Sequence, residues 1–317
     1  RIRNQLSLGV NIGDLFECPT IKSLLSKLSP DQVEEPILPT AGESYELSFA
    51  QKRLWFIDQF KGGSAEYNVS TMLAFKGQVD RASLQRSINA IIARHESLRT
   101  YFKEEFGEPI QVVVPNLEID LPLADLGKLE KSKQSERIAR EAAELFSLDK
   151  LPLIRGKLYR VSDDVSILSV VIHHIVSDGW STGVFYRELS TCYNAFKKGR
   201  EPALFPLPIQ YADYAHWQRQ WLQGDVLEKQ LDYWKKTLKG LEVLEFPSDR
   251  ARPALQTHNG ALCYFKLPSS LSEELATYMK ARRITPFMFF LAAFQTLLGR
   301  YSNQDDIAVG TPIANRQ

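Results

Sequence analysis

Two adjacent histidines, His173 and His174, end an apolar segment and are followed by Asp178 and Gly179. An imidazole exchanges protons near neutral pH, so it can act in a reaction as a general acid or base. Asp178 lies four residues after His174, where its carboxylate could orient a ring or fix a loop. Gly179 lets a substrate approach the backbone closely, and its N–H could donate to a developing oxyanion. This spacing predicts an acyl-transfer site.

Paired histidines have two other common uses. A histidine beside a strand is often a hydrogen-bonded residue of the core. A pair can also bind a metal ion, but neighbours on a strand point to opposite faces, and a tetrahedral site needs three or four converging ligands. The other histidines, His95, His216 and His258, are widely scattered along the chain. We therefore expect no metal, and we predict that one ring of the pair faces the core while the other faces a cavity.

The elements around the pair alternate between strand and helix patterns. Residues 165–172 are rich in β-branched side chains and predict a buried strand, and residues 180–196 predict the helix that follows it. Asp80 can cap a helix whose apolar face is formed by Leu84, Ile88, Ile91 and Ile92. Further strands are predicted at residues 69–75, 99–102, 110–114, 158–161, 261–267 and 306–310, and further helices at residues 132–146, from a capping box between Ser270 and Glu273, and from Thr285. This order indicates an α/β fold.

The composition is that of an ordinary globular protein. With 317 residues and 44% hydrophobic side chains, the chain has room for about two domains. Its formal net charge of +1 does not favour nucleic acid or an anionic membrane as a partner. The three cysteines, Cys18, Cys192 and Cys263, lack metal-site spacing and are typical of a reducing cytoplasm. We therefore expect a cytoplasmic protein that binds neither nucleic acid nor membrane.

Five stretches carry a resemblance to a known family. Residues 173–179 resemble the HHxxxDG signature of the condensation domains of nonribosomal peptide synthetases, which are relatives of chloramphenicol acetyltransferase. Residues 48–55 resemble the family's SxAQxRLW motif, and residues 94–102 its RHExLRTxF motif. Residues 211–217 resemble YxDYAxW, and residues 309–316 resemble IGxPxAxR. Because all five follow the family's order, the chain is identified as a member.

The resemblance also implies a domain organisation. It implies an α/β fold of two chloramphenicol acetyltransferase-like lobes in a V, with residues 44–223 as the first lobe and residues 224–317 as the start of a second, truncated lobe. Residues 1–28 resemble the C-terminal end of a peptidyl carrier domain, through the Leu-Phe-Glu-Cys-Pro-Thr-Ile pattern at residues 15–21. Prolines and acidic residues make residues 29–43 a linker. We expect the chain to be a piece of a longer protein.

The reaction implied by the resemblance is peptide (amide) bond formation. A donor aminoacyl or peptidyl thioester on an upstream peptidyl carrier domain is attacked by the amine of an aminoacyl thioester on a downstream carrier domain. No cofactor is expected to bind to this chain, because the substrates are carried on the phosphopantetheine arms of the carriers. The expected partners are these two carriers and a neighbouring adenylation domain. His174 is the expected catalytic residue.

Six residues are expected to support His174: His173, Asp178, Gly179, Ser181, Arg99 and Arg316. A buried carboxylate favours a cationic partner. The resemblance implies that the partner of Asp178 is an arginine, and the candidates are Arg99 and Arg316. Gly179 is expected to keep the path of the acceptor open. Ser181 is either a helix N-cap or a donor to the oxyanion. Trp180 is expected to pack in the core.

The remaining motifs are predicted to be scaffold. Gln51, Arg53 and Trp55 are expected to build the interface between the lobes, and residues 94–96 to lie at the end of a helix. Residues 172–181 resemble the subtype that joins an L-configured donor to an L-configured acceptor. Three alternatives stay open: an epimerisation domain, an ester-forming relative, and a non-catalytic docking platform.

Overall fold

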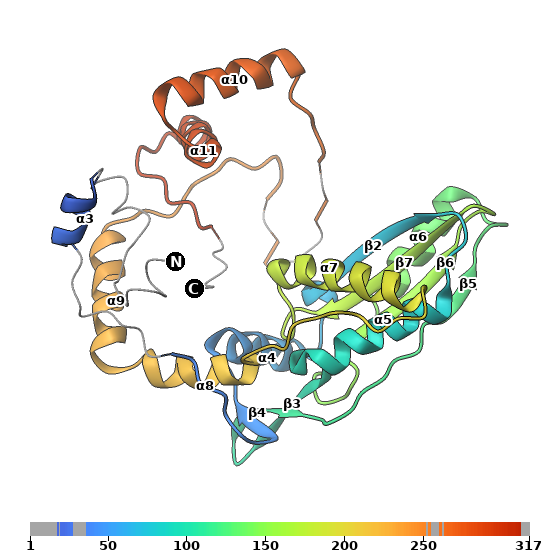
Figure 1. The fold of residues 1–317 in the computed structure, drawn as a ribbon. Coiled ribbons are helices and arrows are strands. Elements are labelled where there is room, and N and C mark those ends of the chain that lie inside the picture. Colours follow the sequence, from blue (N-terminus) through green and yellow to red (C-terminus); the bar gives the residue numbers. More distant parts are fainter. Residues whose placement is uncertain are drawn as a thin grey trace. The chain divides into compact units, whose positions relative to one another are not determined.

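A computed structural model describes residues 18, 20–27, 36–251, 253–254, 260–261 and 263–311 (Figure 1). The chain divides into two compact units, Arg1–Gln220 and Trp221–Gln317. Most of the expected carrier tail lies outside the described residues, apart from its helix α3 (Ile21–Lys27) and two neighbouring residues. The first part of the expected linker, up to residue 35, also lies outside them. No helix in the described part of the chain is long and apolar enough to cross a membrane.

The first unit is built around a four-stranded sheet with the order β2-β7-β6-β5 (Figure 1). Its strands are β2 (Asn68–Lys76), β7 (Val165–His173), β6 (Ile154–Arg160) and β5 (Leu123–Asp125). The pairs β2–β7 and β6–β7 are antiparallel, whereas β5 runs parallel to β6. The central position of β7 matches its near-continuous apolar sequence, because both faces of this strand are covered.

Helices cover the two faces of this sheet. On one face, α5 (Arg81–Arg94) and α7 (Gly179–Phe196) lie against each other (Figure 1), and their apolar side chains share a core cluster with Leu158 of β6. On the other face, Ile138 of α6 (Lys131–Ala142) packs with Tyr159, the next residue of β6. Alternation along the strand therefore sends neighbouring side chains into two different cores.

The predicted apolar face of α5 is confirmed. The carboxylate of Asp80 accepts the N–H of Ser83 at 3.1 Å and caps the helix. All four apolar side chains predicted for this face are buried, among them Ile88. Gly156 of β6 allows this close packing, because a Cβ built on it would lie 3.5 Å from Cδ1 of Ile88 and 3.2 Å from Cδ1 of Leu121. A side chain at this position would require Leu121 to shift by a few tenths of an ångström, whereas its distance to Ile88 is an ordinary contact.

Smaller elements frame the end of the sheet where the histidines lie. A three-stranded sheet has the order β1-β4-β3 and consists of β1 (Ser44–Glu46), β4 (Glu108–Val113) and β3 (Thr100–Glu105). Further helices are α4 (Phe49–Lys61), the short helices η1 (Ala65–Tyr67) and η2 (Glu96–Arg99), and α8 (Tyr211–Trp221).

The predicted helix at residues 132–146 ends early, at Ala142. Two side chains satisfy the carbonyl groups at its end: Nδ2 of Asn68 donates to Ala142 and Glu144, and the guanidinium of Arg155 donates to Glu144 and Leu145. Because these partners replace further helical hydrogen bonds, the chain can turn inward after the helix.

The second unit contains α9 (Gly224–Thr237), α10 (Ser269–Arg282) and α11 (Pro286–Ser302). The start of α11 is confirmed, because the hydroxyl of Thr285 accepts the N–H of Met288. The predicted strands at 261–267 and 306–310 are wrong for their described residues, which pair with no other strand. The predicted capping box is also wrong, because α10 begins after Pro268 without a side-chain cap.

Candidate active site

Three backbone hydrogen bonds hold the segment around His174. Strand β7 ends at His173, and the chain then turns. The N–H of His174 donates to the carbonyl of Tyr67 at 2.8 Å, at the end of η1. The N–H of Val176 donates to the carbonyl of His173 at 3.1 Å, and that of Ser177 to the carbonyl of His174 at 3.4 Å. The position of His174 is thus fixed by the end of the sheet and by its own turn.

The ring of His173 is buried, with 2% of the residue exposed. It lies against the rings of Tyr67 and Phe146, with centroid distances of 6.4 and 6.1 Å. Its Nδ1 atom accepts the N–H of Ile175 at 3.2 Å. Burial, assisted by the neighbouring His174, lowers the pKa of His173 from 6.5 to about 4. The ring is therefore neutral near pH 7, and its hydrogen bond requires an unprotonated Nδ1.

His174, in contrast, is exposed. The two histidines therefore have separate tasks that follow from their places in the chain. His173 is the last residue of the strand and fills the core, whereas His174 is the first residue of the turn and presents its imidazole to solvent. An accessible imidazole on a fixed backbone can orient a nucleophile or accept a proton.

Asp178 directly precedes the next helix, α7, and caps it. Its Oδ1 atom accepts the N–H of Ser181 at 2.7 Å and the hydroxyl of Ser181 at 2.6 Å. Asp178 is thus the N-cap of α7, and the expectation that Ser181 would be the N-cap is wrong, because Ser181 is the third residue of the helix. The carbonyl of Asp178 also accepts the N–H of Thr182 at 3.1 Å. These bonds fix where the helix starts relative to the turn of His174.

Gly179 is the first residue of α7 and is exposed. A Cβ built on it would have no heavy atom within 4 Å, so the space beside its backbone is open. Its neighbour Trp180 is 58% exposed, so the expectation that Trp180 packs in the core is wrong. The start of α7 projects away from the core cluster, and the helix buries its apolar face only from Phe185 onward.

Arg99 binds partners other than Asp178. Its guanidinium forms an ion pair with Glu96 at 3.1 Å and donates to the carbonyl of Val114. Its Nε atom is buried and has no hydrogen-bond partner among the residues that the structure describes. Arg316, the other arginine expected near Asp178, lies outside the described residues.

The predicted motif at residues 94–96 lies at the end of α5, as expected, and contacts α7. Nε of Arg94 and Nε2 of His95 lie 3.0 and 2.7 Å from the carboxylate oxygens of Glu188. The Glu188 side chain is only 12% exposed. The cluster ties the C-terminal end of α5 to the middle of α7.

Three residues that hold the turn of His174 or the helix after it were not predicted as part of the site. Tyr67 accepts the N–H of His174, Glu188 holds α7, and Gln51 reaches the carbonyl of Ile175 from α4. The motif at residues 48–55 carried a signal for Gln51, because serine followed three residues later by glutamine is typical of a capping box. The structure shows this box at Ser48. For Tyr67, whose carbonyl accepts the N–H of His174 and whose ring lies against that of His173, the sequence carried no such signal.

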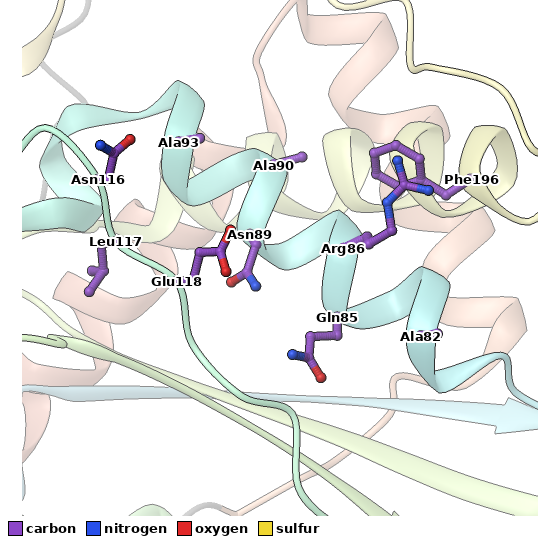
Figure 2. Close-up of a pocket in the computed structure, with 10 residues that line it drawn as sticks. All are labelled: Ala82, Gln85, Arg86, Asn89, Ala90, Ala93, Asn116, Leu117, Glu118 and Phe196. Carbon is purple, nitrogen blue, oxygen red and sulfur yellow. The ribbon is translucent and has the colours of Figure 1, made fainter.

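A groove of about 770 Å³ lies elsewhere on the first unit, along α5. Figure 2 shows Arg86 and Asn89 of α5 lining it, with the ring of Phe196 beside the Arg86 guanidinium and residues 116–118 on the other side. None of the predicted site residues lines this groove. Among the described residues, no group of histidine, cysteine and acidic side chains could hold a metal ion.

Comparisons with known proteins agree with the motifs. A family model described as the condensation domain matches residues 41–317. Over all of its length the chain is 42% identical to a protein of the linear gramicidin synthase of Brevibacillus parabrevis, of which it spans 4%. It is also 39% identical, again over all of its length, to malpibaldin synthetase of Mortierella alpina, of which it spans 6%. The chain therefore corresponds to a small part of the curated relatives that it matches.

Solved structures show the same likeness. The chain resembles the X-domain in a complex of the X-domain and OxyB from teicoplanin biosynthesis, with 27% identity and a TM-score of 0.74 over 85% of this chain and 60% of that one. It also resembles the first condensation domain of the CDA synthetase, with 22% identity and a TM-score of 0.67 over 84% of this chain and 64% of that one. The second likeness shows the fold alone.

Proposed function

We propose, because this chain belongs to the condensation domain family of nonribosomal peptide synthetases, that the site at His174 joins two carrier-bound substrates by an amide bond. The family consists of amide-bond-forming acyltransferases with a chloramphenicol acetyltransferase-like α/β fold. The observation that carries the proposal is the exposed imidazole of His174 on a turn whose backbone is hydrogen-bonded on both sides.

In the proposed reaction, the acceptor amine attacks the carbonyl carbon of the donor thioester. A C–N bond forms, the C–S bond breaks, and the thiolate of the donor arm leaves and takes up a proton. An α-amine has a pKa of about 7.7–8.0, so an appreciable fraction of it is already neutral near pH 7. The remaining demands are to orient the amine and to remove a proton from the zwitterionic tetrahedral intermediate, and we assign both to His174.

The supporting residues act through the backbone or through access. His173 holds Ile175 and stays neutral, so it contributes position and no proton. Asp178 and Ser181 fix the start of α7, and we propose that Gly179 leaves room for the acceptor arm. Arg316 stays a predicted partner of Asp178.

The context of the domain is part of the proposal. We place the end of a carrier domain at residues 1–28, a linker at 29–43, the first lobe at 44–223 and the start of the second lobe at 224–317. The substrates arrive on the phosphopantetheine arms of an upstream and a downstream carrier domain, next to an adenylation domain, and the subtype joins two L-configured residues. The curated relatives are much longer synthetases, one of them dimodular by name, which supports this context.

One comparison favours a second candidate function. The X-domain that this chain resembles was solved in a complex with OxyB, so a domain of this fold can bind a partner protein. A docking platform would bind such a partner and transfer no acyl group. The intact histidine pair, with one ring buried and one exposed, supports the enzyme instead.

Intact-protein mass spectrometry of a donor-loaded and an acceptor-loaded carrier tests the proposal. Incubation with the protein should move the donor mass onto the acceptor carrier. A matched acceptor that bears a hydroxyl in place of the amine separates an amide-forming from an ester-forming enzyme, and chiral analysis of the donor residue detects epimerisation. Absence of transfer from correctly loaded carriers would contradict the proposed function and favour the docking platform.

A further inference from the structure

Two glutamines are buried beside the turn that carries His174. Gln51 lies in the first turn of α4 and Gln111 in the middle of β4, and each is 2% exposed. A primary amide that is buried without hydrogen bonds is costly, so its partners show what it does in the fold.

The hydrogen bonds of Gln51 define the orientation of its amide. Its Oε1 atom accepts the N–H of Ser48 at 3.0 Å, so its Nε2 atom must point the other way. From there Nε2 donates to Oε1 of Gln111 at 3.3 Å and to the carbonyl of Ile175 at 3.5 Å. Gln111 in turn donates to the carbonyl of Glu46 at 2.8 Å.

The two glutamines have different roles in the structure. The bonds of Gln111 stay within the scaffold of α4 and the small sheet, where a side chain of similar size could fill the space. Gln51 alone of the two reaches the active-site turn. Ile175, the residue after His174, is then held at its N–H by His173 and at its carbonyl by Gln51.

We propose that Gln51 is a positioning residue for the reaction at His174. It acts by holding the carbonyl of Ile175, so that the peptide groups on either side of Ile175 keep their orientation. The imidazole of His174 then stays in place beside the substrates. The inference deepens the proposed function and rests on it, because position matters for the rate only if His174 acts on the reacting atoms. Small displacements of a positioned group lower rates steeply, so the effect should appear in kcat.

The chain offers a matched control for this test. Gln51→Met and Gln111→Met make the same chemical change in the same buried pair, but only the first removes the bond to Ile175. We expect both variants to unfold at a lower denaturant concentration. At a temperature where both are folded, kcat should fall at least about tenfold in Gln51→Met and stay within about twofold of the parent in Gln111→Met, with the KM for the acceptor carrier unchanged.

Amide hydrogen exchange provides a readout that does not depend on activity. The N–H groups of Val176 and Ser177 should exchange faster in Gln51→Met than in Gln111→Met. Equal loss of kcat in the two variants, or equal exchange at the turn, would overturn the positioning role and leave Gln51 a stability residue. If the unmutated protein transfers no acyl group, the proposed function fails, whereas the exchange comparison still decides whether Gln51 holds the turn.

Discussion

The N–H of Ile175 donates to Nδ1 of His173 across 3.2 Å. A buried imidazole thus holds the backbone directly after its exposed neighbour, His174. The two histidines therefore act together. The buried ring of His173 fixes the turn, and we assign the contact with the substrates to the exposed ring of His174.

The protonation of His173 is predicted to couple stability to pH. Its pKa is about 4 in the folded protein and 6.5 when the ring is fully solvated, so between these values the unfolded chain binds a proton that the folded chain does not. The free energy of unfolding should then fall as the pH is lowered from about 6.5 to about 4, by up to about 1.4 kcal/mol per pH unit.

Urea unfolding at pH 7 and pH 5 measures this effect. His173→Asn is a suitable comparison, because its Oδ1 atom can replace Nδ1 as acceptor but does not titrate. The difference in stability between the two pH values should be smaller in this variant by the histidine contribution. An equal difference in both proteins would show that His173 does not lower stability in this range.

The cap of α7 is predicted to matter for activity as well as for stability. Asp178→Ala should lower the free energy of unfolding by about 1 kcal/mol through loss of the cap, and should slow acyl transfer because α7 begins beside the turn of His174.

Asp80→Ala is the matched control, because Asp80 caps α5 through the N–H and the hydroxyl of Ser83, in the same pattern that Asp178 makes with Ser181. It should lower the free energy of unfolding through loss of its own cap and leave kcat unchanged. If both variants lose transfer equally at a temperature where they are folded, the cap of α7 has no special role in the site.

Large side chains at position 179 are predicted to hinder access of the acceptor and not folding. Because a Cβ at this position meets open space, Gly179→Ala should fold and transfer as the parent does. Gly179→Leu should keep the fold but raise the KM for the acceptor carrier, since the longer side chain enters the space that we assign to the acceptor arm. Steady-state kinetics with varied acceptor carrier provides the measurement, and an unchanged KM in Gly179→Leu would place the acceptor elsewhere.

The sequence predicts the parts of this site that depend on local pattern. The apolar run of β7 and the apolar stripe of α5 are local, because burial repeats along the element itself. The strands expected at residues 261–267 and 306–310 show what a local pattern cannot predict, because an extended segment becomes a strand only when another strand pairs with it. The hydrogen bond from Gln51 to the carbonyl of Ile175 joins two residues that are 124 positions apart in the chain. Such a contact follows from topology and is not visible in a single sequence.

The contacts of Glu188 with Arg94 and His95 are predicted to hold α7 on α5. Glu188→Gln removes the charge that faces Arg94 and His95, and should lower the free energy of unfolding by about 2 kcal/mol, because these side chains are largely buried. Glu108→Gln breaks the exposed pair with Lys52 and should change stability little. Chemical denaturation of both variants makes the comparison, and equal effects would mean that burial does not strengthen the Glu188 cluster.

The most direct test of the account is the rate of acyl transfer in His174→Ala beside His173→Asn and the parent, followed by intact-protein mass spectrometry of the loaded carriers. We expect transfer by His174→Ala to be about 100-fold slower than by the parent, since general acid–base catalysis commonly contributes a factor of this size. His173→Asn, which keeps an acceptor for Ile175, should retain most of the rate. Transfer by His174→Ala at the rate of the parent would contradict the assignment of the reaction to His174.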